Sequence, residues 1–419
     1  MASFLQNHQR LIILRGRNKK AFTQLISATS YYLKIRSSSY TSKEAFRQLH
    51  TSIATSLQSC ETAIQHRSNF SYNIAASYVA KRNKFDSNHD FYDFKLDSKD
   101  DSYQKSLTRQ QHQRLYVDDR LGTGQDAFFV SKIGKSQDIV MGIADGVGGW
   151  ADSGVDPADF SHGICHYMKY VASTYEKENW NGSDLHARSL MRYGYNELCH
   201  DQFVTAGGST ACVAVARNNG TLEVANLGDS GYVLLRSNHV HSHSIPQTHS
   251  FNTPFQLSIV PREIILQTSL FGSAHFQDAP EMANITENNL MHGDVLIIGS
   301  DGLWDNLFYS DILKIVSQAM LRAQAWEFSS SSGFNVGKNL TAKVQNYPEE
   351  VNRQTRPQSL HRTIAINITS EAKAASINKT RDGPFSREVK KKLPNMYFRG
   401  GKTDDICVIV AIVCEVGKS

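Results

Sequence analysis

The chain has 419 residues, 40% hydrophobic and 20% charged, with a formal net charge of +5. This composition is ordinary for a globular protein, and no apolar run approaches the roughly 18 residues of a membrane helix, so we expect no transmembrane segment. The charge is unevenly placed, because residues 1–50 carry nine Lys/Arg and one acid, which leaves a net −3 for the other 369 residues. A body with that charge has no electrostatic basis for binding nucleic acid, so we expect no nucleic-acid partner.

Residues 1–50 have the composition of an organelle-targeting leader. They are basic, poor in acids and rich in Ser and Thr, and the apolar stretch 11–14 is too short for a secretory signal. We therefore predict a mitochondrial transit peptide at 1–50 and a location in the mitochondrial matrix. The alternative interpretation is a basic tail without a targeting role.

Residues 51–103 are predicted to be a linker with little structure. The part from Asp86 to Asp101 is acidic, with scattered aromatic residues such as Phe91 and Phe94. The composition changes near residue 104, and we expect one domain to extend from 104 to 416.

Within 104–416, hydrophobic patterns predict several strands and helices. The residues 222–226 and 232–235 flank Gly228-Asp229-Ser230-Gly231, which predicts that these two strands pair as a hairpin. Strands gathered at both ends of the domain, with helices between them, indicate an α+β fold rather than alternating βαβ units. The expected strands are 128–133, 139–144, 210–216, 222–226, 232–235, 295–299 and 406–413, and the expected helices are 161–175, 185–203 and 312–325.

One segment, 327–385, departs from this pattern. It is rich in Ser, Asn, Thr and Lys and lacks sustained periodicity. We predict a polar, largely disordered insertion there, with a helix near 339–351.

Three predicted apolar strands each lie next to an aspartate. Residues 139–144 run into Asp145, residues 295–300 run into Asp301, and Asp404 comes shortly before 406–410. An ionised carboxylate at the end of a buried strand is unfavourable unless it is paired or bound to a cation. Mg²⁺ and Mn²⁺ favour carboxylate oxygens, so these residues predict a shared cation site. A single Asp-Gly pair would be a plain turn; three such strand ends together are harder to explain as turns.

Six short motifs follow one another along the chain, namely Gln125-Asp126-Ala127-Phe128-Phe129, Asp145-Gly146-Val147-Gly148-Gly149, Gly208-Ser209-Thr210, residues 226–230, residues 300–305 and Asp404-Asp405. Their order resembles that of the protein phosphatase 2C (PPM) family over about 104–416. Residues 145–150 with 154–157, and residues 251–257, further resemble the mitochondrial PTC-seven-homolog subgroup of that family.

The resemblance implies a four-layer fold, in which two β-sheets pack face to face between helices, and at least two Mn²⁺ or Mg²⁺ ions at one end. By motif position, Asp145 would bridge the two ions and the Gly146 carbonyl would bind the second, while Asp301 and Asp404 would bind the first. These aspartates would be catalytic through metal-bound water. The implied reaction is hydrolysis of phosphoserine and phosphothreonine in phosphoproteins by a metal-bridging hydroxide, in a chain that we expect to be a monomer.

Further motif residues are implied to lie in or near the site. Asp126 belongs to the first motif, and Asp229 and Asp305 match positions that hold a third ion in relatives. Thr210 matches a buried structural position, so no role in binding is expected for it.

Three positions depart from the family pattern. Many relatives have Glu at Gln125, His at Val147 as a proposed general acid, and a phosphate-binding Arg at Leu121; Arg120 is adjacent to the last. These departures favour an alternative interpretation, a pseudophosphatase that acts as a binding module. A structural calcium domain is a weaker alternative, since no Asp-x-Asn/Asp-x-Asn/Asp-Gly loop is present. No cysteine starts a Cys-x5-Arg loop, which excludes cysteine-based phosphatase chemistry.

Overall fold

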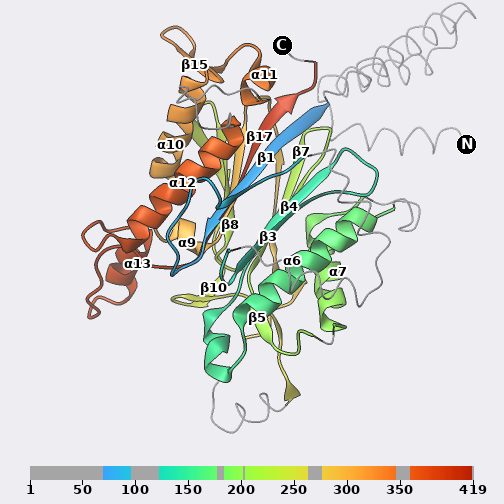
Figure 1. Ribbon diagram of the computed structural model, residues 1–419, viewed down its shortest axis with the longest axis vertical. Helices are drawn as coiled ribbons and strands as arrows, with labels where there is room; N and C mark the ends of the chain where they lie inside the picture. The colour runs from blue at the N-terminus through green and yellow to red at the C-terminus, as the bar shows by residue number, and fades with distance from the viewer. Residues whose placement is uncertain are drawn as a thin grey trace, which may run out of the picture. The chain divides into compact units, whose positions relative to one another are not determined.

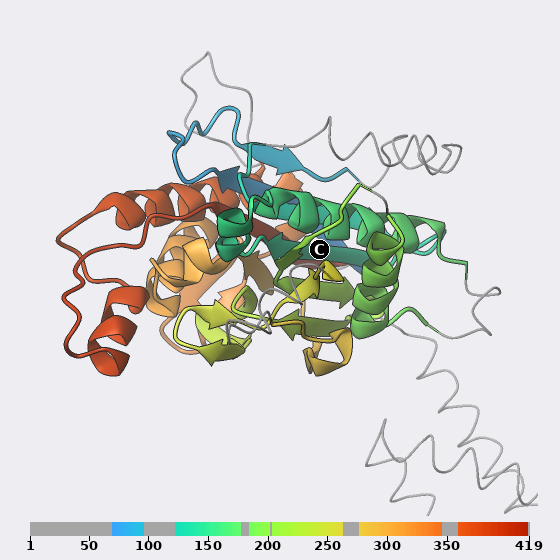
Figure 2. The ribbon, with the colours of Figure 1, turned by 90° about the horizontal axis from the view of Figure 1, so that it is seen from below.

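The computed structural model describes residues 69–95, 122–176, 184–201, 203–262, 276–345 and 359–417. These residues belong to one compact unit, 68–419. Within it, two antiparallel β-sheets pack face to face and helices cover their outer sides (Figures 1 and 2). The predicted leader, 1–50, lies outside the described residues.

The larger sheet has six strands. Its order is β2 (Phe91–Asp93), β1 (Phe70–Val79), β17 (Ile406–Glu415), β14 (Val295–Gly299), β8 (Gly231–Arg236) and β9 (His239–His243). The other sheet has five strands, in the order β13 (Asn284–Asn289), β7 (Thr221–Leu227), β6 (Ala211–Ala216), β4 (Ile139–Asp145) and β3 (Asp126–Lys132).

Two pairs of helices form the outer layers. In Figure 1, α6 (Pro157–Thr174) and α7 (Ala187–Cys199) cover the five-stranded sheet, and α10 (Tyr309–Arg322) and α12 (Leu360–Ile377) cover the six-stranded sheet. Asp156 caps α6, because its side chain accepts a hydrogen bond from the Ala158 amide and Pro157 is suited to the first helical position. In the described part of the chain, no helix is long and apolar enough to cross a membrane.

The described residues also contain shorter elements. Their further helices are η1 (Gly148–Ser153), η3 (Pro280–Met282), α9 (Asp301–Trp304), α11 (Leu340–Gln345) and α13 (Pro384–Lys392). Three small antiparallel pairs are β5 (Gly207–Ser209) with β12 (Leu257–Ile259), β10 (Thr248–Ser250) with β11 (Thr253–Pro254), and β15 (Trp326–Ser329) with β16 (Gly333–Val336).

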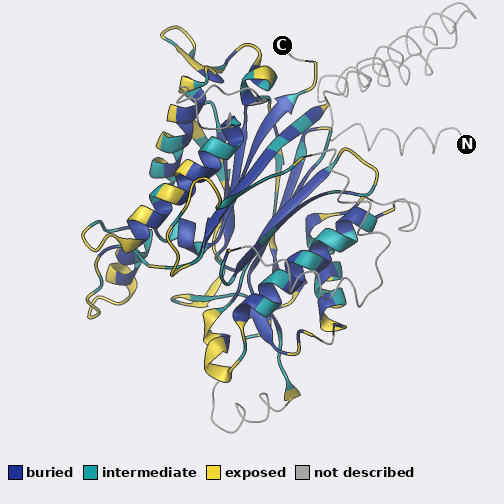
Figure 3. Cartoon of the chain, viewed as in Figure 1, coloured by how far each residue is buried: buried dark blue, intermediate teal, exposed yellow. Residues whose placement is uncertain are grey.

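The four layers explain why the central strands are apolar throughout. Along β4, Met141 and Ile143 face the core between the two sheets, whereas Val140 and Ala144 face the core under α6 and α7. Both faces of the strand are therefore buried, and a continuous apolar run results rather than an alternating one. In Figure 3 the central strands are buried along their length, whereas the helices that cover them are exposed on one side.

The prediction of a linker at 51–103 is wrong for part of its length. Residues 70–79 form β1, which lies between β2 and β17 in the six-stranded sheet and pairs with β17 along all ten of its residues. The strand contains small and polar residues such as Ala75, Ala76 and Ser77, all fully buried. This composition resembles a linker locally, and only long-range pairing makes it a core strand.

The predicted hairpin between 222–226 and 232–235 is also wrong. Both strands form, but β7 pairs with β6 and β13, whereas β8 pairs with β14 and β9. The chain passes from one sheet to the other at Gly228, whose φ of +99° lies in the left-handed region that favours glycine. These residues connect the two sheets and do not join the strands of a hairpin.

The predicted disordered insertion at 327–385 contains regular structure in its described part. It includes nearly all of the β15–β16 pair, α11, which begins one residue after the start of the predicted 339–351 helix, and α12. Leu360, Ile364, Ile368 and Ala372 recur every four residues on the buried face of α12. This is the spacing of an amphipathic helix, so α12 is a core element and not a loop.

Candidate metal centre

The ends of five strands meet at one end of the paired sheets. Asp145, the last residue of β4, lies directly opposite Asp126, the first residue of β3. In the other sheet, Gly299 at the end of β14 pairs with Val408 near the start of β17 and with Gly231 at the start of β8. The residues that flank these strands are therefore brought together, and they include Asp229 before β8, Asp301 and Asp305 after β14, and Asp404 before β17.

Two hydroxyl groups join the sheets at this end. The Ser300 hydroxyl donates a hydrogen bond of 2.6 Å to Asp126 Oδ2 and accepts one from the Cys407 amide. The Thr210 hydroxyl lies 2.7 Å from the Ser230 hydroxyl and accepts a hydrogen bond from the Asp145 amide. Thr210 is buried and supports the main chain of Asp145, as expected for a structural position.

The carboxylates are close enough to perturb one another. Burial raises the pKa of Asp145 well above its usual value, and the charges of Asp301, Asp126 and Asp404 raise it further. Burial and the charge of Asp405 raise the pKa of Asp126 in the same way. Like charges held together out of water disfavour ionisation, so this end of the molecule would gain from a bound cation.

Asp229 and Asp305 belong to the same cluster. Burial, with the charges of Asp301 and Asp305, raises the pKa of Asp229 to about 8. Burial raises the pKa of Asp305 to about 7, although the Lys402 ammonium opposes this shift. Burial and Asp301 also raise the pKa of Asp404. All the carboxylates predicted from the motifs are thus coupled in one place.

A lysine that the sequence analysis did not single out lies among these carboxylates. Lys402 Nζ is 2.6 Å from Asp301 Oδ2, 2.7 Å from Asp305 Oδ2 and 3.3 Å from Asp404 Oδ2. Burial opposes its charge, but the carboxylates outweigh burial and raise the pKa of the ammonium. With the side chains in these positions, no three His, Cys, Asp or Glu residues in the described ranges form a metal-binding group.

The residues nevertheless fit a divalent cation in charge and in chemistry. Asp126 is buried, and within the described part of the chain its Oδ1 has no hydrogen-bond partner. A buried carboxylate oxygen without a partner is costly unless it meets a cation or a donor. The surrounding groups are carboxylates, which are the ligands that Mg²⁺ and Mn²⁺ prefer.

Close main-chain packing explains two of the motif glycines. A Cβ on Gly302 would lie 1.9 Å from the Asp405 carbonyl oxygen, and a Cβ on Gly146 would lie 2.6 Å from the Pro157 carbonyl oxygen. Asp405 itself holds neighbouring segments in place, because its carboxylate accepts hydrogen bonds from the main-chain amides of Gln125 and Lys81. The Asp-Gly pairs therefore bring chain segments together as well as presenting a carboxylate.

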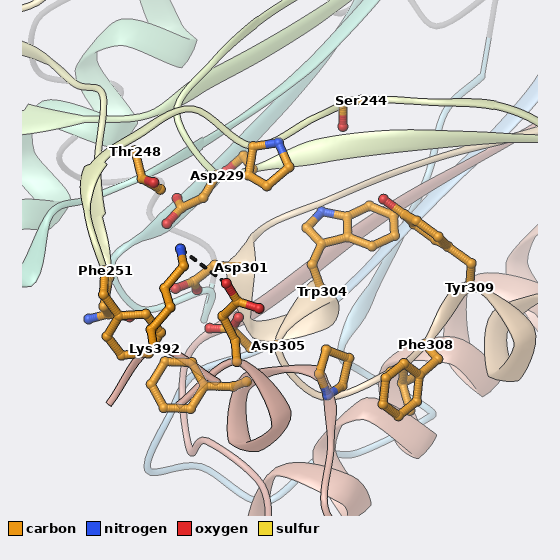
Figure 4. Close-up of a pocket in the computed structure, with 17 residues that line it drawn as sticks. Asp229, Ser244, Thr248, Phe251, Asp301, Trp304, Asp305, Phe308, Tyr309 and Lys392 are labelled. Atoms are coloured by element: carbon orange, nitrogen blue, oxygen red, sulfur yellow. Dashed lines mark ion pairs between the residues drawn. The ribbon is translucent and has the colours of Figure 1, made fainter. Parts of the chain in front are cut away.

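A pocket of about 330 Å³ adjoins the carboxylates. Figure 4 shows Asp229, Asp301 and Asp305 to the left of the Trp304 ring, with Tyr309 on its other side. Phe251, from the turn between β10 and β11, and Phe385, from α13, form an aromatic pair at 5.4 Å on the pocket wall. The dashed line in Figure 4 is an ion pair of 3.0 Å between Lys392 and Glu388 on α13.

Comparison with known proteins identifies the family. Residues 122–333 match the family model described as protein phosphatase 2C. "Protein phosphatase PTC7 homolog fig" of Drosophila ananassae is 36% identical over 297 residues, which cover 70% of this chain and 74% of the relative. The protein of that name from Drosophila melanogaster is 32% identical over 292 residues, covering 69% of this chain and 77% of the relative.

The chain belongs to the protein phosphatase 2C family. "Protein phosphatase 2C homolog 7, mitochondrial" of Saccharomyces cerevisiae is 29% identical over 302 residues, which cover 72% of this chain and 78% of the yeast protein. The predicted resemblance to the protein phosphatase 2C family and its PTC-seven subgroup is therefore confirmed.

A solved structure supports the fold assignment. The photosystem II phosphatase PBCP has a TM-score of 0.50 and 23% identity, and the match covers 81% of this chain and 98% of that structure. The predicted α+β fold with packed sheets and flanking helices is confirmed by this likeness and by the layers described above.

The three residues that depart from the protein phosphatase 2C pattern, Gln125, Val147 and Leu121, lie in different structural environments. Gln125 is partly buried, and its main-chain amide donates to Asp405 Oδ2 at 3.0 Å. Val147 is partly exposed at the N-terminal end of η1, where its amide donates to the Gly208 carbonyl at 2.9 Å. Leu121 and Arg120 lie outside the described residues. Lys402 and the aromatic pocket had no recognised sequence signal, although Lys402 is only two residues from Asp404.

Proposed function

We propose that this chain is a metal-dependent protein phosphatase that hydrolyses phosphoserine and phosphothreonine. The observation that carries the proposal is the convergence of Asp126, Asp145, Asp301 and Asp404 at one end of the two sheets, with a buried Asp126 oxygen that lacks a partner. Membership of the protein phosphatase 2C family supports the reaction class.

In this proposal, Asp145, the Gly146 carbonyl, Asp301 and Asp404 hold two Mn²⁺ or Mg²⁺ ions. Such ions lower the pKa of water toward neutrality and neutralise phosphoryl oxygens during in-line displacement. The chain's own contribution is to hold close together acidic side chains that would otherwise repel one another. Ser300 fixes Asp126 by a hydrogen bond of 2.6 Å, and the Thr210 hydroxyl accepts from the Asp145 amide.

Asp126, Asp229 and Asp305 extend the acidic site. Burial and neighbouring charge raise the pKa of each of them. This electrostatic coupling supports a role in binding a further ion, as the motif positions imply. Their oxygens lie in the same cluster as Asp301, and Asp229 and Asp305 also line the pocket.

The pocket supports a phosphoprotein as the substrate. It lies beside Asp301 and Asp305, and its wall is aromatic at Phe251, Trp304 and Phe385. An apolar side chain next to the phosphorylated residue would be buried there when the phosphate reaches the metal ions that the carboxylates are proposed to hold. The composition of residues 1–50 and the name of the yeast relative support a mitochondrial location, and we place the substrates in the matrix. We further propose that the chain acts as a monomer, which sedimentation of the purified protein would test.

The first prediction tests the metal site directly. Asp145→Asn and Asp301→Asn should each lower kcat/KM on a phosphoserine peptide by several orders of magnitude, because each removes charge from the proposed site. The purified protein should need added Mn²⁺ or Mg²⁺, and chelation should abolish turnover while thiol alkylation should not.

Asp156→Asn is the matched control. Asp156 is exposed and caps α6 through a side-chain oxygen that asparagine also has, so this variant should retain turnover. Equal losses in all three folded variants, or turnover that survives exhaustive chelation, would contradict the metal mechanism.

A non-catalytic binding module is the second candidate, favoured by Gln125 and Val147. Turnover of an aryl phosphate by the metal-loaded protein would separate the two candidates. A folded protein that binds Mn²⁺ and phosphopeptide but releases no phosphate would establish the binding module.

A further inference from the structure

The side chain of Lys402 lies where the carboxylates of the proposed metal centre face one another. Its ammonium contacts Asp301 at 2.6 Å, Asp305 at 2.7 Å and Asp404 at 3.3 Å, and only 16% of the side chain is exposed. Asp301 and Asp404 are the carboxylates that share one ion in the proposed function. A cation bound there and the ammonium would therefore compete for the same oxygen atoms.

The main chain of Lys402 is held independently of its side chain. Its amide donates to Asn306 Oδ1 at 3.0 Å, and its carbonyl accepts from Asn306 Nδ2 at 2.8 Å. Asn306 is buried and also donates to the Gly302 carbonyl, which ties this contact to α9. The side chain can therefore turn away while the segment before β17 stays in place.

The pocket offers the side chain another position. Lys402 Nζ lies 5.1 Å from the centre of the Phe385 ring, and Phe385 lines the pocket together with Glu388, a carboxylate that also pairs with Lys392. An ammonium is attracted to an aromatic face and to a nearby carboxylate. A displaced Lys402 would thus keep favourable partners on the side of the centre that faces the pocket.

Electrostatic repulsion prevents the Lys402 ammonium and a divalent cation from contacting the same carboxylates at the same time. A divalent ion in contact with Asp301 and Asp404 would lie within a few ångströms of the ammonium, where like charges repel strongly in a partly buried site. We propose that Lys402 is an internal counterion that a divalent cation displaces from Asp301, Asp305 and Asp404. Lys402 thereby weakens metal binding and stabilises the metal-free centre. This inference rests on the proposed function, since it requires a metal centre at these residues.

Metal binding and melting of the full chain test this inference without an activity assay. Lys402→Met keeps the length of the side chain and removes its charge. In calorimetric titrations of chelator-stripped protein, this variant should bind Mn²⁺ about tenfold more tightly than the natural chain, since removal of a competing charge favours the ion. Without metal it should melt at a lower temperature than the natural chain, because the carboxylates lose their counterion. Mn²⁺ should therefore raise its melting temperature by a larger increment.

Two further variants serve as controls. Lys402→Arg keeps the positive charge and should bind Mn²⁺ no more tightly than the natural chain. Lys81→Met removes another lysine that faces Asp404, at 3.4 Å, but the Lys81 side chain is 51% exposed and its charge is screened by water. Lys81→Met should change Mn²⁺ affinity less than about twofold. A charge effect specific to the position of Lys402 would therefore appear in Lys402→Met alone.

The outcomes distinguish this inference from the proposed function. If the natural chain binds Mn²⁺ and folded Lys402→Met binds it equally or more weakly, Lys402 organises the carboxylates and the counterion proposal is wrong. If Lys402→Met does not fold without metal, Lys402→Gln takes its place in the same titration. If none of the folded proteins binds Mn²⁺ or Mg²⁺, the metal centre itself is wrong and both proposals fall.

Discussion

Val147 follows the Asp145-Gly146 pair and begins the turn into η1. A valine side chain cannot donate a proton, yet the serine alkoxide is a strongly basic leaving group that benefits from one. General acid catalysis is worth about 10²–10⁴-fold where it operates. His162 is another residue that could supply the proton, and its Nε2 lies 3.4 Å from the Thr123 hydroxyl, which donates to the Asp126 carbonyl. The structure therefore places His162 next to the start of β3.

The second prediction concerns this position. Val147→His should raise the rate on a phosphoserine peptide relative to nitrophenyl phosphate, whose leaving group needs no acid. It should also add an ionisation in the acidic-to-neutral range to the pH–rate profile, because imidazole titrates there. Val147 is partly exposed, so a larger side chain has room toward solvent. An unchanged substrate ratio in a folded, metal-loaded variant would show that water suffices as the proton donor.

At the scale of elements, α12 connects the outer helical layer to the acidic site. The Lys373 ammonium donates to the carbonyls of Ala80 at 3.1 Å and Lys81 at 2.8 Å, at the end of β1. The Lys81 amide in turn donates to Asp405. A helix in the predicted insertion thus supports the segment that carries Asp404, and deletion of 327–385 should destroy the fold rather than spare the site.

The third prediction tests whether α12 is a core helix. Ile368 is fully buried between α12 and the six-stranded sheet, so Ile368→Ala should lower the free energy of unfolding by about 2–5 kcal/mol. Ile377 lies at the end of the same helix with 61% of its surface exposed, and Ile377→Ala should be nearly neutral. Denaturant unfolding of both variants measures the difference. Two neutral substitutions would mean that α12 does not pack as described.

The fourth prediction concerns α13 and the pocket. Phe385→Ala should raise KM for a phosphopeptide with an aromatic or aliphatic neighbour to the phosphoserine, because it removes a wall of the pocket. The rate on nitrophenyl phosphate should change little. Phe328 lies on β15 with 66% of its surface exposed, so Phe328→Ala is the control. It should change neither KM for the phosphopeptide nor the rate on nitrophenyl phosphate. Equal KM values for all peptides would exclude this pocket from substrate binding.

At the scale of the whole molecule, residues 68–419 form one compact unit. The fifth prediction is that a variant lacking residues 1–50 keeps its catalysis and moves from mitochondria to the cytosol, because a transit peptide directs the chain without joining the fold. Fractionation of cells and turnover by the purified variant measure the two effects. A shortened protein that stays mitochondrial would place the targeting signal elsewhere.

The sequence alone determined the features that depend on short stretches of chain. Apolar runs identified β4, β14 and β17, and the polar residue at each strand end marked Asp145, Asp301 and Asp404. These signals are local, because a strand with two buried faces must be apolar, and a charged side chain is tolerated only where the strand leaves the core. The ordered motifs then identified the family, and with it the four layers.

Only the tertiary structure decided which segments meet. Local turn chemistry could not show that Gly228 to Ser230 connect two sheets, and the small residues of β1 could not show that this segment pairs with β17, because strand partners are chosen by contacts far apart in the sequence. The position of Lys402 has the same origin. Nothing in its neighbours along the chain places an ammonium between Asp301 and Asp305, about a hundred residues away; the pairing of β14 with β17 does, because it brings the end of one strand to the start of the other.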